Sequence, residues 1–126
     1  MTYIPPTDDM KFALRYLAGF DDVTALPAFT DTGLDLADAV IDEAAKLAAD
    51  VIAPLNHASD LKGAAYSDID SSVQTPDGFA DAYRAMAEGG WTSMEAEEAF
   101  GGQNMPMALS APVNEMWQSA SLSFAL

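Results

Sequence analysis

Apolar residues recur at helical spacing through the middle of the chain, from residue 35 to residue 55. One face carries Leu36, Val40, Ala44, Leu47, Val51 and Leu55, and Ala37, Ile41, Ala48 and Ile52 widen it. This apolar arc is too broad for a helix that touches one neighbour, so it predicts a helix packed on two sides. We expect Asp42 and Lys46 to pair on the solvent side and Pro54 with Asn56 to end the helix.

Two shorter helices are predicted on either side of this segment. The first follows Pro5 and Pro6, with Thr7 as its cap, and ends before Gly19. Residues 21–33 and 57–74 are rich in turn-forming or polar residues and are expected to be loops. A second short helix follows the cap and first-turn signal at residues 75–77, and Gly89–Gly90 closes it.

The last predicted helix carries an apolar stripe that extends to the end of the chain. Its members are Leu109, Val113, Met116, Trp117, Ala120 and Phe124. Pro112 leaves two alternatives, a kink at the proline or a late start with Ser110 as the cap and Pro112 in the first turn. We favour the late start.

No segment alternates apolar and polar residues with the period of a β-strand. The expected fold class is therefore all-α, with up-down helices joined by long loops. The 126 residues are enough for one domain with a modest core.

The charge excludes several classes of partner. Twenty acidic residues against five basic ones give a net charge of −15. Nucleic acids and anionic membranes are both recognised through cationic side chains, so neither is an expected partner. Ligands rich in phosphate would need most of their contacts from elsewhere.

The sequence also limits redox chemistry and targeting. Cysteine is absent, which rules out disulfides, thiolate metal sites and a cysteine nucleophile. No secretory signal and no apolar run of roughly 20 residues is present. We expect a cytoplasmic protein.

Few residues are candidates for chemistry. Glu95, Glu97 and Glu98 form a sequential acidic run, which we interpret as a solvated loop rather than a metal or acid–base site. His57 is expected on the surface after a helix end. The pair at 101–102 could cradle a phosphate, but two glycines alone fit a structural turn with positive φ, which Asn104 also tolerates. We predict no metal site.

The chain ends on Ser123, Phe124, Ala125 and Leu126 without any residue that caps a helix. We interpret the chain as the front part of a longer protein.

Several motifs in this order resemble a known family. They are Thr75-Pro76-Asp77-Gly78-Phe79, Glu88-Gly89-Gly90-Trp91, Phe100-Gly101-Gly102-Gln103, Met105-Pro106, Asn114-Glu115-Met116-Trp117 and Ser121-Leu122-Ser123-Phe124-Ala125. Together they resemble the N-terminal helical domain of the acyl-CoA dehydrogenases, on the branch that includes 3-methylmercaptopropionyl-CoA dehydrogenase. Asn104 departs from the pattern, because the family usually has Gly there, and so does Pro112.

The resemblance implies an FAD-dependent oxidoreductase of fatty acid metabolism. In such enzymes a glutamate takes the α-proton of an acyl-CoA thioester, and the β-hydrogen leaves as hydride to the flavin. Electrons then pass to an electron-transfer flavoprotein, and the complete enzyme is expected to be a homo-oligomer. The base and most flavin contacts belong to later domains, so no catalytic residue is assigned to this chain, which we expect to be inactive and without FAD by itself.

The resemblance also divides the chain and suggests a role for its end. Residues 1–34 correspond to an N-terminal extension with a short helix, and residues 35–126 to the helical domain, incomplete at its C-terminus. Phe124, Ala125 and Leu126 are candidates for the wall of the acyl pocket, supported by the turn at 101–106. The alternative is a free-standing acidic helical interaction module without catalysis.

Overall fold

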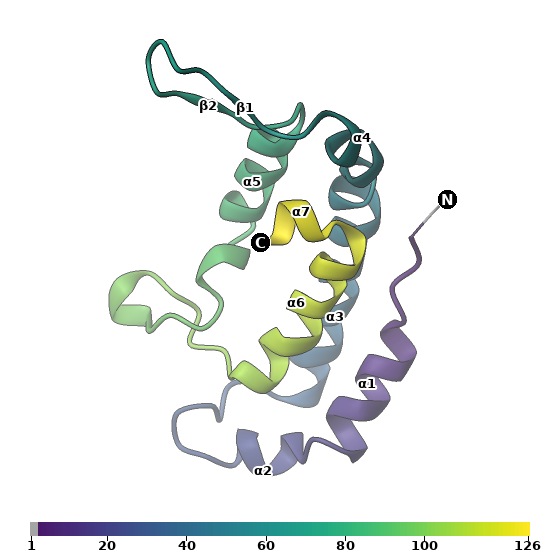
Figure 1. Cartoon of the computed structure of the whole chain (residues 1–126). Helices are drawn as coiled ribbons and strands as arrows, with labels where there is room; N and C mark the ends of the chain where they lie inside the picture. The colour runs from purple at the N-terminus through teal and green to yellow at the C-terminus, as the bar shows by residue number, and fades with distance from the viewer. Residues whose placement is uncertain (1–2) are drawn as a thin grey trace.

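The computed structural model describes residues 3–126, and its regular elements are helices apart from one short β-hairpin (Figure 1). The α-helices are α1 (Thr7–Tyr16), α2 (Phe20–Thr24), α3 (Leu34–Leu47), α4 (Leu55–Lys62), α5 (Phe79–Glu88), α6 (Met107–Ala120) and α7 (Leu122–Ala125). A π-helical turn, Ala48–Ile52, extends α3, and two 3₁₀ turns, Trp91–Ser93 and Glu98–Phe100, follow α5. The all-α fold class is confirmed.

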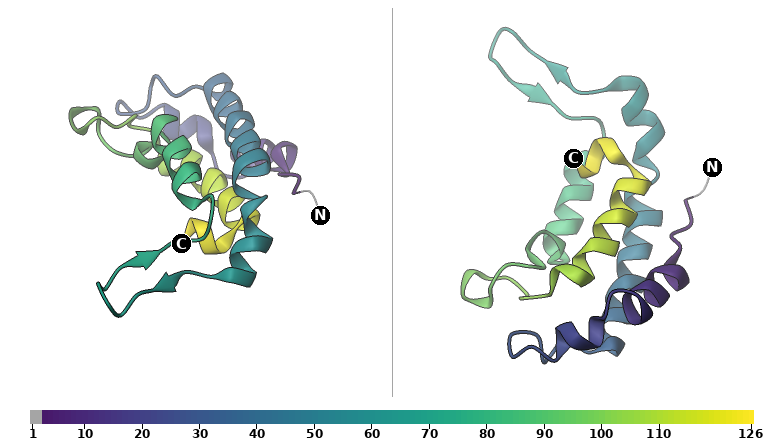
Figure 2. Two further views of the ribbon diagram at one scale, coloured as in Figure 1. Left: turned by 90° about the horizontal axis from the view of Figure 1, so that it is seen from above. Right: turned by 60° about the horizontal axis from the view of Figure 1, so that its bottom comes forward.

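The core lies where α3 packs against α6, with α1 beside both helices (Figures 1 and 2). The fully buried positions of α3 and its π-helical extension are Ala37, Ile41, Ala44, Ala48 and Ile52. They meet a stripe on α6 made of Leu109, Val113, Met116, Trp117 and Ala120. The packing of α3 on two sides, against α1 and α6, is therefore confirmed.

The face of α3 that is most buried is not the one with the largest side chains. The positions expected to widen the apolar face are fully buried, whereas Leu36 is 42% exposed and Val40 is only partly buried. The spacing between packed helices depends on the side chains at the contact. The contact with α6 thus combines small alanines with the larger side chains of Ile41 and Ile52, and Leu36 and Val40 remain more exposed.

The long helix ends at Ile52, just before Pro54 as predicted, but Asn56 lies inside a new helix that begins directly after the proline. Proline lacks the N–H that would continue the ladder, but its backbone angles stay helical at φ −60° and ψ −24°. Just before it, the N–H of Ala53 donates to the carbonyl of Ala48 at 2.8 Å, which is the spacing of a π-turn. The chain therefore bends and continues as α4, which includes His57 and Ser59 in a stretch predicted to be loop.

Two further elements were not predicted. The link expected at 21–33 begins inside α2, whose Phe20 is fully buried. A small antiparallel hairpin joins β1 (Ala65–Tyr66) to β2 (Val73–Gln74) and projects from one end of the molecule (Figure 2). Strands of two residues are too short to show a period of two in the sequence.

Three predicted helix starts are wrong. Thr7 lies inside α1, and the helix begins after Pro6. The residues 75–77 precede α5, whose cap is Gly78 with φ 87°. Helix α6 begins at Met107, so the late start at Ser110 is incorrect. Pro112 removes only one N–H donor from the backbone hydrogen bonds of the helix. Because the helix starts early, Leu109 lies within its first turn and is fully buried.

Helix α6 also ends earlier than its apolar stripe. Ser121 adopts an extended backbone, with φ −159° and ψ 99°, and separates α6 from the short α7. Phe124 consequently belongs to α7. It is only partly buried, although its spacing matched the stripe of α6.

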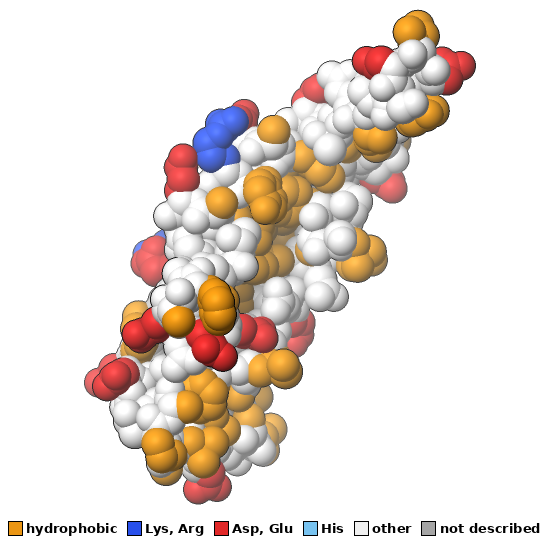
Figure 3. All heavy atoms as spheres, turned by 90° about the vertical axis from the view of Figure 1, so that its left-hand side faces the viewer, with side chains coloured by type: hydrophobic (Ala, Val, Ile, Leu, Met, Phe, Trp, Pro, Cys, Tyr) orange, Lys and Arg blue, Asp and Glu red, His pale blue; other side chains and the backbone are white. Residues whose placement is uncertain are grey.

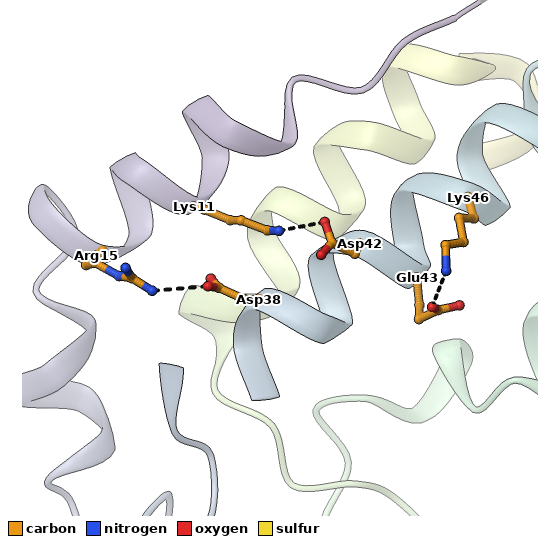
Figure 4. Close-up of polar contacts among 6 residues, drawn as sticks. All are labelled: Lys11, Arg15, Asp38, Asp42, Glu43 and Lys46. Carbon is orange, nitrogen blue, oxygen red and sulfur yellow. Dashed lines mark hydrogen bonds and ion pairs between the residues drawn. The ribbon is translucent and has the colours of Figure 1, made fainter. Parts of the chain in front are cut away.

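Two of the surface ion pairs connect one helix to another. Lys11 of α1 lies 2.6 Å from Asp42, and Arg15 lies 3.1 Å from Asp38, so two pairs join α1 to α3 (Figure 4). Lys46 instead contacts Glu43 at 2.5 Å. The expected Asp42–Lys46 pair is therefore wrong, because Asp42 has a partner on the neighbouring helix.

The turn that precedes α6 folds back on residues 93–96. A Cβ at Gly102 would lie 1.9 Å from the carbonyl oxygen of Ala96, so only glycine fits there. Gly101 has φ 80° and Asn104 has φ 50°, as expected for a structural turn. The Asn104 side chain also donates to the carbonyl of Ala28 at 2.9 Å, which ties the turn to the segment before α3.

Within residues 3–126, none of the helices has the length and apolar character needed to cross a membrane.

We predict that Ile41→Ala lowers the free energy of unfolding by about 2–5 kcal/mol, because it leaves a cavity at the fully buried α3–α6 contact. The matched variant Leu36→Ala, on the same helix, should cost about 1 kcal/mol or less. Urea unfolding followed by far-UV circular dichroism measures both. Equal losses for the two variants would contradict the assignment of the buried face.

Gly102→Ala is expected to cost about 1–3 kcal/mol, since the added methyl group forces the backbone away from Ala96. Gly33→Ala is the control. Its φ is −77° and no atom lies within 4 Å of the added Cβ, so a net effect within about 0.5 kcal/mol is expected. The same denaturation assay applies, and a tolerated alanine at 102 would rule out this close approach.

Candidate functional site

A hollow near the chain end lies between α5, residues 91–96, α6 and α7. We call it the tryptophan cavity, and its volume is about 490 Å³. Its lining residues are Tyr83 and Met86 of α5, Trp91 through Ala96, Ser110, Asn114, Trp117 and Gln118 of α6, and Phe124 and Ala125 of α7. The cavity thus collects side chains from distant parts of the sequence.

Two glycines and one glutamine position the first wall of this cavity. Gly89 and Gly90 end α5, and Gly90 adopts φ 77°, which glycine tolerates without strain. The side-chain nitrogen of Gln103 donates to the carbonyl of Gly90 at 2.7 Å, and the Gln103 N–H donates to the carbonyl of Ser93 at 3.1 Å. These bonds hold the Trp91 turn against the turn before α6.

The base of the tryptophan cavity is aromatic. The rings of Trp91 and Trp117 meet edge to face, with centroids 5.7 Å apart and an interplanar angle of 90°. Trp117 is 5% exposed and belongs to the core cluster. Because its ring also lines the cavity, the cavity shares part of its wall with the core and is held in shape by it.

The polar groups of the cavity lie on α6 and on the acidic loop. The hydroxyl of Ser110 donates to the Glu95 carboxylate, and the carbonyl of Met107, 3.2 Å away, is the alternative acceptor for the same proton. Asn114 and Gln118 are four residues apart and line the same side. None of the described lining residues is positively charged, so the cavity suits an apolar or uncharged group better than an anion.

The three candidate wall residues occupy different positions. Phe124 and Ala125 are part of the cavity lining, whereas Leu126 is 91% exposed and is not part of it. The ring of Phe124 meets Phe79 edge to face, with centroids 5.1 Å apart. The supporting turn at 101–106 contacts the cavity wall through Gln103 and does not line it.

The other candidate residues from the sequence, His57, Glu97 and Glu98, do not line the tryptophan cavity. His57 is exposed on α4, and Glu97 and Glu98 are exposed beside Glu95. Within the described part of the chain, no group of three or more His, Cys, Asp or Glu side chains is arranged to hold a metal ion.

The described residues do not fit a group that carries phosphates, as FAD and coenzyme A both do. All five Lys and Arg side chains lie within residues 3–126, and each has an acidic partner. Besides the three pairs already described, Lys62 pairs with Asp77 at 2.8 Å and Arg84 with Asp81 at 2.9 Å. Binding a diphosphate here would require breaking these pairs in a chain of net charge −15.

Several lining residues were not recognised as site residues from the sequence. Tyr83 and Met86 were assigned to the apolar stripe of α5, Asn114 was quoted only within a family motif, and Gln118 was not singled out. The only signal for the latter pair is its spacing of four on α6, which shows a shared face but not what that face meets.

Comparison with known proteins gives no match to a family model, but relatives match most or all of the chain. It is 32% identical over 126 residues to 3-methylmercaptopropionyl-CoA dehydrogenase of Ruegeria pomeroyi, covering 100% of this chain and 21% of that protein. It is 30% identical to a butyryl-CoA dehydrogenase of Syntrophomonas wolfei, covering 98% and 20%. It is 29% identical over 107 residues to the broad-specificity linear acyl-CoA dehydrogenase FadE5 of Mycobacterium tuberculosis, covering 85% and 18%.

The chain thus spans about a fifth of the length of these relatives. Its all-α fold agrees with the helical N-terminal domain that the motifs predicted. These matches, which run through the turn before α6 and the tryptophan cavity, establish that the chain belongs to the acyl-CoA dehydrogenase family.

Proposed function

We propose that this chain is the N-terminal helical part of an FAD-dependent enzyme that dehydrogenates an acyl-CoA thioester between its α and β carbons. Its role in that enzyme is to form part of the wall of the acyl pocket through Phe124 and Ala125. The observation that carries the proposal is the position of Phe124 and Ala125 in the lining of the tryptophan cavity, in a chain matched end to end by an acyl-CoA dehydrogenase.

The chemistry of the cavity supports an acyl ligand. Trp91, Trp117, Met86 and Met94 give it large apolar surfaces, and methionine adapts its shape to flexible chains. Burying each methylene of an acyl chain contributes about 0.8 kcal/mol, which such a surface supplies without charged groups.

The charges of this chain also indicate which ligands the rest of the proposed enzyme binds. We propose that FAD, the phosphates of coenzyme A, the catalytic base and the electron-transfer flavoprotein are bound by other domains. The pairing of every Lys and Arg supports this division. The chain alone is then inactive, and contacts between subunits of a homo-oligomer also lie outside it.

We further propose that residues 1–34 are an extension of the helical domain at 35–126. Met10, Leu14 and Phe20 of the extension are buried in the common core. The extension would therefore stabilise the domain rather than act as a separate unit.

The test is a chimera in which this chain replaces the matched segment of the Ruegeria pomeroyi dehydrogenase. We expect the chimera to bind flavin and to oxidise acyl-CoA, measured by the reduction of an electron-accepting dye. Phe124→Ala in the chimera should lower kcat/KM about tenfold, because a large apolar contact with the acyl chain contributes about 1–3 kcal/mol.

Leu61→Ala is the control for this experiment, because Leu61 is 75% exposed on α4 and does not line the cavity. It should leave kcat/KM unchanged. A chimera that binds flavin stoichiometrically but has no activity would contradict the proposal, as an interaction module would behave in this way. Stoichiometric yellow flavin on the isolated chain, bleached by acyl-CoA, would contradict its inactivity alone.

A further inference from the structure

A second hollow lies on the other side of Phe124. We call it the hairpin groove; it has a volume of about 520 Å³ and is lined by α5, α7 and the residues that flank the β-hairpin. Its walls include Ala64, Pro76, Phe79, Tyr83 and Phe124. Figure 3 shows hydrophobic side chains gathered in a hollow on this face of the molecule, with acidic side chains along its border.

Among residues 3–126, two residues line both hollows. Phe124 and Tyr83 belong to the wall of the tryptophan cavity and to the wall of the hairpin groove. They come from α7 and α5, respectively. The two side chains together therefore form the partition between the hollows.

The position of Phe124 in this partition is set by its neighbours. Phe79 meets its ring edge to face, with an interplanar angle of 84°, a favoured geometry for two aromatic rings. One residue before it, the hydroxyl of Ser123 lies 3.1 Å from that of Ser59 on α4 and 3.3 Å from that of Ser121. Contacts on both sides of the α7 turn thus fix where the Phe124 ring stands.

We propose that Phe124 and Tyr83 set the upper limit on the length of the acyl tail that this site accepts, with Phe79 as a positioning residue. This inference rests on the proposed function, which places the tail in the tryptophan cavity. The tail ends at the partition, and the hairpin groove beyond it is closed to the tail. Removing the Phe124 ring joins the two hollows into one longer apolar channel.

The groove is suited to the end of an alkyl chain. None of the described residues that line it is charged, and the hydroxyl of Ser123 already has partners within the protein. An alkyl tail therefore enters without leaving a charge or a bonded hydroxyl unpaired.

The test uses the whole 126-residue chain and uncharged S-acyl-N-acetylcysteamine thioesters with tails of four to twelve carbons. These probes lack phosphates, so they report on the acyl site alone. Binding is followed by tryptophan fluorescence, because both tryptophans of the protein, Trp91 and Trp117, line the tryptophan cavity. Each added methylene should tighten binding by about fourfold, which corresponds to ~0.8 kcal/mol, until the tail reaches the partition.

In the unaltered chain the dissociation constant should stop falling at an intermediate tail length. In Phe124→Ala it should continue to fall by about fourfold per methylene for tails at least two carbons longer. Tyr83→Ala is the second variant. Tyr83 is 62% exposed, so its loss disturbs the core little, and it should extend the limit in the same direction. Leu61→Ala is the control and should keep the original limit.

The inference is overturned if Phe124→Ala and Tyr83→Ala, with unchanged circular dichroism, keep the original length limit. It is also overturned if the unaltered chain shows no length limit or binds none of the thioesters. The chimera assay judges the proposed function separately, because activity of the chimera does not depend on where the length limit lies.

Discussion

The contact between α3 and α6 is the interaction on which the other features of the structure depend. Ala37, Ala44 and Ala48 are fully buried on α3 and its extension, and their small side chains allow α6 to pack closely. This packing orients α6 so that Trp117 faces both the core and the cavity. Helix α1 packs against both members of this pair.

The functional surface depends on two interruptions of regular structure. The turn at 101–104 requires glycine where the backbone approaches Ala96 and a positive φ at Asn104. Ser121 then breaks α6 and redirects the chain, so that Phe124 stands between two hollows instead of continuing the core stripe. Asn104 stands where the family usually has glycine, and its side chain offsets the strain of positive φ by bonding to Ala28.

The five Lys and Arg side chains all form ion pairs with acidic side chains. Two of the five ion pairs hold α1 on α3, and the other three involve α3, α4 and α5. Exposed pairs of this kind contribute about 0–1 kcal/mol each. Their larger effect is on recognition, since they occupy the cations that could bind phosphate. The apolar cavity walls then become the surface best suited to a ligand.

Residue periodicity in the sequence predicted the all-α class, the existence of α1, α3, α5 and α6, and the two-sided packing of α3, because each helix carries an apolar pattern of its own. The ordered motifs predicted the family. The cap signals at Thr7, Thr75 and Ser110 were misleading, because local signals compete with tertiary packing. Only the tertiary structure decided which face of α3 is buried, where α6 breaks and which residues share a cavity. These features depend on contacts between segments distant in sequence, such as Phe79 with Phe124, which no local pattern encodes.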